Sequence, residues 1–296
     1  MMAAAALDVG VMAQLACLLE VSAPKPGNIS PRRHFADARY EDFLASAAAI
    51  GAPLAGAGTR PLGATIRLAI EATADWTGSN TNLGLVLLLA PLARAAARAC
   101  PAARLRDSLR QVLDTTTVDD ARDAYEAIRR VSPGGLGRVD EQDVSAEPTI
   151  TLVDAMRLAA DRDSIAREYA TAFETTFEAG APALARARAD DLEWDDAIVE
   201  TFLTLLAARE DTHIARRAGA ALATEVTSGA RDVLAAGGVR TATGRRALEE
   251  FDGRLRDEHH RANPGTTADL TAAAVFVVLA CGGWTIRTGG RDAAGG

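Results

Sequence analysis

The stretch NPGTTADLTAAAVFVVLA, residues 263–280, joins a loop with proline and glycine to the most apolar part of the chain. The uncharged run that begins inside it extends from Leu270 to Ile286. This run is shorter than the roughly 20 apolar residues that a bilayer requires, and it contains Gly282 and Gly283. We therefore predict a helix in the core of a globular protein, with a polar loop at its N-terminal end.

The rest of the chain has the same helical character. Of its 296 residues, 48% are hydrophobic but only 4% are aromatic. Good helix formers such as Ala, Leu, Arg and Glu dominate, and the alternating Val, Ile and Tyr runs of strands are missing. We predict an all-α fold: a single domain of about ten to twelve helices over residues 1–288, followed by a disordered tail at 289–296.

Apolar periodicity and capping residues place the expected helices. Pro91 falls inside one of them, and it should kink that helix or end it early. The expected ranges are 7–21, 40–54, 61–75, 82–97, 103–113, 118–131, 151–160, 164–179, 195–208, 212–236, 243–259 and 267–286.

Charge and cysteine content exclude several classes of protein. The net charge is −8 and no basic stripe is concentrated anywhere, which argues against a nucleic-acid partner. Cys17, Cys100 and Cys281 are far apart and form no CxxC pair, so neither a zinc site nor a disulfide framework is indicated. The N-terminal stretch carries Asp8 and no positive region, unlike a signal peptide. We expect a cytoplasmic protein without membrane contact, of open oligomeric state.

The first polar stretch is EVSAPKPGNIS, residues 20–30, which contains the only lysine of the chain, Lys25. Prolines on both sides restrict the backbone and Gly27 permits a turn, so a flexible ammonium is mounted on a stiff base. The alternative is a helix stop with a solvated lysine. Glu20 lies at the end of the first expected helix, where the macrodipole disfavours a carboxylate. A cation or metal nearby would relieve this, unless Glu20 is simply solvated.

The second polar stretch is GSNTNLG, residues 78–84, directly before an apolar helix. Asn80, Thr81 and Asn82 are all competent N-caps, and the free N–H groups of a helix start attract phosphate or carboxylate groups. Ordinary capping explains one of these side chains. Three of them between two glycines exceed what a cap needs.

The third stretch is REDTHIARRAG, residues 209–219. His213, Arg216 and Arg217 share a helix face, and guanidinium groups bind phosphate in a bidentate manner. This face is either an anion receptor or a solvated basic face paired with Glu210 or Glu225.

The fourth stretch is the opening loop, residues 263–269. Thr266 and Asp269 fit a capping box, which leaves Asn263 and Gly265 unexplained. All four stretches adjoin the ends of apolar helices, so packing of these helices would bring the polar ends to one rim. Such a rim suits a polyphosphate with Mg²⁺. No Walker A, GxGxxG or HExxH pattern is present, so a standard nucleotide fold is not indicated.

In this order, the segments EVSAPKPGNIS, NTNLGLVLLLAPL, DTHIARRAG and NPGTTADLTAAAVFVVL resemble the triphosphoribosyl-dephospho-CoA synthase family. PGGLG with QDV, and AADRDSIAREYA, add weaker support. The resemblance extends roughly from Glu20 to Leu279. One departure is Asn82, which occupies the histidine position of the family segment Asn-Thr-His-x-Gly.

The resemblance implies an all-helical, Mg²⁺-dependent transferase that binds ATP. Such an enzyme joins the ribose C1 of ATP to the 2′-hydroxyl of 3′-dephospho-CoA and expels adenine, in the biosynthesis of a prosthetic group. Because of Asn82, the acceptor stays open: a related enzyme could use another alcohol, as in pterin cofactor assembly, or phosphoribosyl pyrophosphate as donor. An alternative of a different class is a helical binding protein without catalysis.

Residue roles follow from the same resemblance. Lys25, Arg216 and Arg217 are assigned to phosphate. The other residues expected to bind substrate are Gly27, Asn28, Asn80, Asn82, Gly84, Asn263 and Gly265.

Breaking a ribose C1–N bond builds oxocarbenium character, so the site needs a carboxylate near C1, an acid for the departing base and a base for the hydroxyl. Glu20 and Asp211 are the candidates for stabilising C1 or for the general base. His213 is the candidate proton donor to the departing base. Asp269 is the candidate Mg²⁺ ligand, although its predicted capping role competes.

Overall fold

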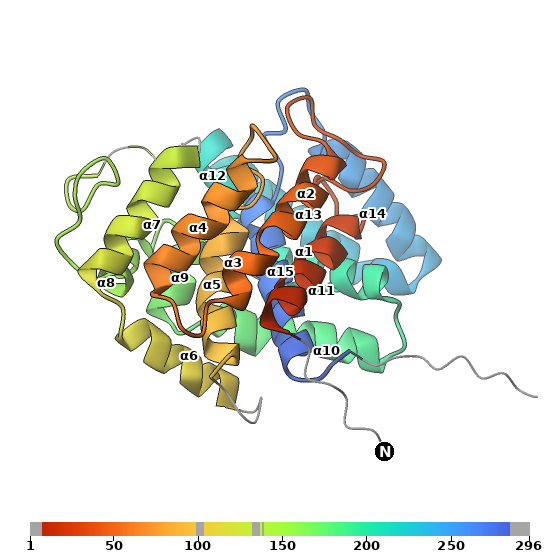
Figure 1. Cartoon of the computed structure of the whole chain (residues 1–296). Coiled ribbons are helices and arrows are strands. Elements are labelled where there is room, and N and C mark those ends of the chain that lie inside the picture. The colour runs from red at the N-terminus through yellow and green to blue at the C-terminus, as the bar shows by residue number, and fades with distance from the viewer. Residues whose placement is uncertain (1–7, 99–103, 132–136, 138, 285–296) are drawn as a thin grey trace, which may run out of the picture.

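The computed structural model describes residues 8–98, 104–131, 137 and 139–284. Within these ranges the chain forms helices and no strand, apart from an isolated bridge between Ser30 and Arg33. The predicted all-α class is confirmed (Figure 1). One cluster of buried apolar side chains extends from Met12 to Leu279. The single domain over residues 1–288 stays a prediction, and the predicted disordered tail, 289–296, lies outside the described residues.

Most helices follow one another with short connections, and a longer one, residues 23–39, follows the first helix (Figure 1). They are α1 (Val9–Ser22), α2 (Tyr40–Ala49), α3 (Gly51–Ala55), α4 (Leu62–Ala74), α5 (Leu83–Ala96), α6 (Leu105–Asp114), α7 (Val118–Val131), α8 (Leu152–Ala159), α9 (Ser164–Ala170), a π-helix (Thr175–Gly180), α10 (Ala181–Ala189), α11 (Trp194–Ala208), α12 (Thr212–Ala218), α13 (Ala220–Ala235), a 3₁₀-helix (Gly238–Arg240), α14 (Ala242–Leu255) and α15 (Gly265–Ala280).

Some predicted helices are divided, so the described elements are more numerous than predicted. The predicted helix 212–236 breaks at Gly219, whose φ of 95° ends α12 and starts α13. The predicted helix 164–179 breaks where Ala172 and Phe173 adopt positive φ values of 50° and 58°. Such values leave the right-handed helical region, so the chain must restart a helix afterwards.

The restart is organised by Glu168, a fully buried side chain at the end of α9. Its carboxylate accepts hydrogen bonds from Thr175 N (3.0 Å), Thr176 N (2.9 Å) and Thr176 Oγ1 (2.6 Å). The π-helix begins at these residues and continues directly into α10, a helix that the sequence analysis did not predict.

Helix α15 is the central element of the core. Every residue from Leu270 to Leu279 is buried, and the helix packs against α1, α5, α10 and α11 (Figure 1). This confirms the prediction of a core helix in the quoted stretch, although the helix ends at Ala280 rather than at residue 286. In the described part of the chain, no helix is both long and apolar enough to span a membrane.

Helix α5 continues through Pro91 to Ala96, so the proline does not end it early. A proline has no N–H to donate to the carbonyl four residues before it, which here belongs to Leu87. The buried Tyr169 hydroxyl donates to Leu87 O at 2.6 Å and replaces the missing bond. The helix therefore tolerates Pro91 because α9 supplies a donor.

The segments after α1 and after α14 lie side by side at one end of the molecule (Figure 1). Phe35 stacks on His260 with ring centroids 3.8 Å apart, and Gly27 N donates to Asp252 Oδ1 at 2.8 Å. These contacts bring the KPG segment to the loop before α15.

Candidate functional site

At the end of α1, Lys25 folds back onto its own helix. The side chain is 0% exposed, and its Nζ lies 2.9 Å from Glu20 Oε1. Nζ also donates to the carbonyl oxygens of Glu20 and Ala23 at the C-terminal end of the helix. The interpretations of Lys25 as a solvated lysine and of Glu20 as a solvated glutamate are therefore wrong. The cation expected near Glu20 is Lys25 itself, and it stabilises the negative end of the α1 dipole.

Glu20 is buried, and its carboxylate is incompletely satisfied. The contact of Oε1 with Lys25 is poorly aligned, so this buried oxygen accepts no hydrogen bond from the described residues. Burial raises the pKa of Glu20 and the ion pair with Lys25 opposes that rise. We give the ion pair the greater weight at neutral pH because a 2.9 Å contact between buried opposite charges strongly favours the ionised form.

At the start of α5, the three predicted capping residues make different hydrogen bonds. Asn82 is the N-cap residue but its side chain makes no capping hydrogen bond, and Asn80 Oδ1 instead accepts from Leu83 N at 3.2 Å. Asn82 Nδ2 donates to Thr73 Oγ1 at 2.8 Å, and the Thr81 hydroxyl bonds to Ser46. The two additional side chains thus attach this loop to α4 and α2.

Asp211 is the N-cap of α12 and is buried. Its Oδ1 accepts from His213 N (2.8 Å) and Ile214 N (3.1 Å), and its Oδ2 accepts from Thr267 N and Oγ1, both at 2.7 Å. Burial raises the pKa of Asp211 and these hydrogen bonds oppose that rise. Because both oxygens already accept hydrogen bonds, a general base at Asp211 would have to give up some of them, and its role in C1 stabilisation or as general base stays a prediction. Asp211 joins the start of α12 to the start of α15.

The basic face of α12 has partners other than the predicted Glu210 and Glu225. Arg216 forms an ion pair with Asp163, the N-cap of α9, and its Nε is buried without a hydrogen-bond partner in the described chain. Arg217 is exposed, and within the described residues it makes two long contacts, to His213 Nε2 and His259 O, both at 3.4 Å.

His213 is held neutral at physiological pH. Burial, followed by the charges of Arg216 and Arg217, lowers its pKa from 6.5 to about 4. A proton donor to the departing base needs the imidazolium form near neutral pH. The lowered pKa does not favour the expected role of general acid, which stays a prediction, and the His213 ring lies beside Gly265.

The predicted capping box at Thr266 and Asp269 is wrong. Helix α15 starts at Gly265 after Pro264, so Asp269 lies beyond the first turn and caps nothing. No hydrogen bond or ion pair is recorded for its carboxylate among the described residues. Burial raises the pKa of Asp269 well above its ordinary value, and the charges of Glu20, Asp211 and Asp163 add to this, opposed by Arg216.

Asp269 points at the start of α5. A Cβ atom placed on Gly84 would lie only 2.0 Å from Asp269 Oδ2, so the glycine leaves the room that the carboxylate occupies. Asn263 Oδ1 meanwhile accepts from Asn28 Nδ2 at 2.9 Å. The four predicted polar stretches thus converge where α1, α5, α12 and α15 meet.

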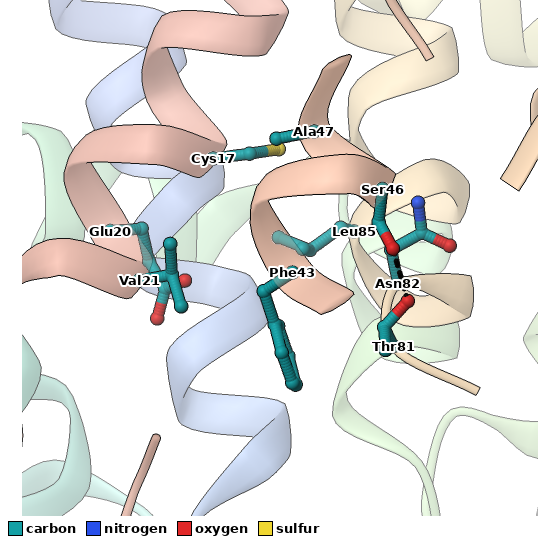
Figure 2. Close-up of a pocket in the computed structure, with 9 residues that line it drawn as sticks. All are labelled: Cys17, Glu20, Val21, Phe43, Ser46, Ala47, Thr81, Asn82 and Leu85. Atoms are coloured by element: carbon teal, nitrogen blue, oxygen red, sulfur yellow. Dashed lines mark hydrogen bonds between the residues drawn. The ribbon is translucent and has the colours of Figure 1, made fainter. Parts of the chain in front are cut away.

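A cavity of about 10 Å³, enough for about one water molecule, lies within this convergence. Figure 2 shows Glu20 from α1, Phe43 and Ser46 from α2, and Asn82 at the start of α5 around it. A larger open groove of about 570 Å³ along α3, α4 and α7 contains none of the predicted site residues. Of the predicted site residues, Glu20 and Asn82 line this narrow internal space, which is too small to hold a nucleotide.

The carboxylates fit a magnesium ion only if the substrate shares in its coordination. Within the described ranges, no group of three His, Cys, Asp or Glu side chains is placed to hold a metal alone. Asp269 nevertheless adds a carboxylate to this region, and Mg²⁺ prefers one or two carboxylates together with substrate phosphates and water.

Some residues of the site were missed by the sequence analysis. Asp163 and Thr267 bind Arg216 and Asp211, and Asp252 binds the backbone of Gly27. Asp163 had a local signal, because it immediately precedes Ser164 as an N-cap. Thr267 and Asp252 had no local signal in the sequence, because their partners are distant along the chain.

Comparisons with known proteins agree on one family. The model of the ATP:dephospho-CoA triphosphoribosyl transferase family matches residues 6–288. A protein of Pseudomonas paraeruginosa named "Probable 2-(5''-triphosphoribosyl)-3'-dephosphocoenzyme-A synthase" is 38% identical over 123 residues, covering 40% of this chain and 41% of the relative. A protein of the same name from Pseudomonas putida is 39% identical over 113 residues, covering 38% and 40%. The matched part of the chain thus spans about two fifths of each relative's length.

A solved structure is similar over more of the chain. The crystal structure of a "putative triphosphoribosyl-dephospho-coA synthase" from Archaeoglobus fulgidus has a TM-score of 0.63 and 28% sequence identity. The similarity covers 81% of this chain and 99% of that one.

Proposed function

The chain belongs to the ATP:dephospho-CoA triphosphoribosyl transferase family, and from this premise we propose that it transfers the triphosphoribosyl group of ATP to the 2′-hydroxyl of 3′-dephospho-CoA. In this reaction the C1′–N9 bond of ATP breaks and adenine leaves with the electron pair and a proton. A bond forms between C1′ and the acceptor oxygen, whose proton passes to a base.

One observation carries this proposal. Segments far apart in the sequence bring Glu20 and Asn82 to one small cavity, where Glu20 Oε1 accepts no hydrogen bond from the described residues. Asp269 lies next to this region, against Gly84 at the start of α5. A carboxylate next to C1′ stabilises the positive charge that develops as the bond to adenine breaks. We assign this role to Glu20, which lines the cavity (Figure 2).

The triphosphate is assigned to Arg216 and Arg217. Arg217 is exposed at the rim, and Arg216 has a guanidinium nitrogen without a partner among the described residues. The amides of Asn28 and Asn263 bond to each other beside α12 and are proposed to exchange that bond for one to ribose or phosphate. Asn80 and Asn82 are proposed to line the ribose side, and Gly27, Gly84 and Gly265 to allow close approach of the substrate.

Asp269 is proposed to hold Mg²⁺ when the nucleotide binds. The ion would neutralise charge on the triphosphate. Until then, the unpartnered Asp269 keeps a place for a cation among neighbouring carboxylates. A cytoplasmic location fits the proposal, because ATP is the donor.

The test is the release of adenine. Purified protein with ATP, Mg²⁺ and 3′-dephospho-CoA should release adenine and form the triphosphoribosyl adduct in equal amounts, measured by liquid chromatography and mass spectrometry. ATP alone should give much less adenine. If adenine appears only with another alcohol, or if only phosphoribosyl pyrophosphate serves as donor, the proposed substrates are wrong. If no donor or acceptor gives product, the proposed reaction is wrong.

A further inference from the structure

We propose that Lys25 is a positioning residue, which fixes the Glu20 carboxylate toward the cavity and does not bind phosphate. The inference rests on the proposed function for the role of Glu20, but its structural part can be tested without turnover. It changes the role that the sequence indicated for the only lysine of the chain.

The ammonium group of Lys25 is enclosed by the end of its own helix. Of its three donors, two bond to backbone carbonyl oxygens. Here Nζ contacts the Glu20 carboxylate at 2.9 Å, the Ala23 carbonyl at 3.2 Å and the Glu20 carbonyl. With the side chain 0% exposed, a phosphate could reach Nζ only by displacing these partners.

The backbone directs the lysine inward. Lys25 N donates to Ala23 O at 2.8 Å, and Asn28 N donates to Lys25 O at 3.2 Å, so the segment folds back immediately after α1. Gly27 completes the turn with a φ of 72°, and Asp252 holds its N–H. The prolines and the glycine therefore aim the side chain at Glu20.

The surroundings of Glu20 leave its orientation to Lys25. The charged and titratable groups near Glu20 are Lys25, Asp269 from α15 and Cys17 one turn earlier on α1. Among these Lys25 alone is a cation, and its Nζ lies 2.9 Å from Glu20 Oε1. Without the lysine, a carboxylate that is 3% exposed would have no opposite charge beside it to fix its position next to C1′.

The first experiment uses the fact that the chain has one lysine. Native protein is treated with an acetylating reagent, with and without ATP and Mg²⁺, and peptides are analysed by mass spectrometry. The α-amino group reacts and serves as the internal control. We expect Lys25 to stay unmodified in both samples and to react only after unfolding in urea. Rapid acetylation of Lys25 in the native protein, with protection by ATP, would overturn the proposal.

The second experiment separates catalysis from binding. Lys25→Met should lower kcat for adenine release by about 100-fold or more, as expected for loss of a transition-state charge. It should change KM for ATP and the ATP Kd by less than about threefold. Arg217→Met is the matched control, because it removes an exposed cation assigned to phosphate, and it should raise KM. A rise in KM on Lys25→Met as large as that on Arg217→Met would contradict the positioning role.

A double variant covers the case in which Lys25→Met does not fold. Glu20→Gln/Lys25→Met removes both charges, so it avoids the unpaired buried ion that destabilises single variants. If Lys25 acts only through Glu20, the kcat and the ATP affinity of the double variant should equal those of Glu20→Gln. ATP affinity about tenfold weaker in the double variant would show a direct contact. If wild-type protein releases no adenine, the proposed function fails, while the acetylation result still decides where Lys25 lies.

Discussion

The sequence and the structure indicate different roles for Asp269. Its spacing from Thr266 indicates a cap, yet in the fold it lies one turn too late and no hydrogen bond or ion pair is recorded for it in the described chain. A carboxylate kept there at a cost in stability is typical of a functional group. Because the Asp269 carboxylate does not stabilise the fold, we infer that it has a role in binding.

Replacing Asp269 with Asn should therefore separate stability from function. For the wild-type protein without ligand, the raised pKa of Asp269 means that its contribution to stability is complete below the ordinary carboxyl pKa of about 4. That contribution is lost as the pH rises through the raised pKa. Asp269→Asn has no such group, so at pH 7 we expect an unchanged or higher Tm. Adenine release should fall by about 100-fold or more.

The measurement is a series of melting curves from pH 4 to pH 8 for both proteins, with kinetics at pH 7. The difference in Tm between variant and wild type should increase toward high pH. A variant that melts well below the wild type at pH 7 and retains specific activity would show that Asp269 is structural.

At the scale of elements, the start of α5 depends on a glycine that has a packing reason. Alanine normally stabilises a helix relative to glycine by about 1 kcal/mol. At Gly84 the added Cβ would lie 2.0 Å from Asp269 Oδ2, so α5 and α15 would have to separate or the carboxylate would have to turn away. Gly84→Ala should consequently lower both Tm and activity.

The matched control is Gly253→Ala in α14. A Cβ at Gly253 meets nothing within 4 Å, so this variant should gain about 0.5–1 kcal/mol of stability and keep its activity. Urea unfolding and adenine release are measured for both variants. Equal stabilisation by the two substitutions would mean that Asp269 does not rest against α5.

The elements were largely predictable because helical periodicity is a local property. The core helix α15 and the ends of α1, α4 and α7 follow from apolar spacing and caps. The interruption after α9 does not follow from apolar spacing, because it depends on the hydrogen bonds of buried Glu168 with Thr175 and Thr176. Local propensity cannot show which carboxylate will be buried.

At the scale of the whole molecule, the convergence of the polar helix ends was predicted, but the pairing inside it was not. The sequence indicated a rim of free cations. In the fold Lys25 is paired with Glu20, and Arg216 with Asp163, through contacts that only tertiary packing creates. Around Asp269, carboxylates therefore outnumber cations, with Glu20, Asp211 and Asp163 all raising its pKa.

This charge balance argues that ATP binds as its magnesium complex. Four phosphate charges brought to a group of carboxylates would be repelled unless a divalent cation came with them. ATP with Mg²⁺ at about 100 times Kd should stabilise the protein by about 2.7 kcal/mol. For a chain of this size that corresponds to a rise in Tm of several degrees, and ATP with EDTA should bind at least about tenfold more weakly.

Asp269→Asn distinguishes this electrostatic explanation from a general effect of EDTA. The variant removes one of the repelling charges, so metal-free ATP should bind it better than it binds the wild type, while the advantage of adding Mg²⁺ should shrink. Calorimetric titration of both proteins with ATP, with and without Mg²⁺, measures the four affinities. Equal binding of ATP to the wild type in EDTA and in Mg²⁺ would mean that the triphosphate lies away from these carboxylates, beside the exposed Arg217 alone.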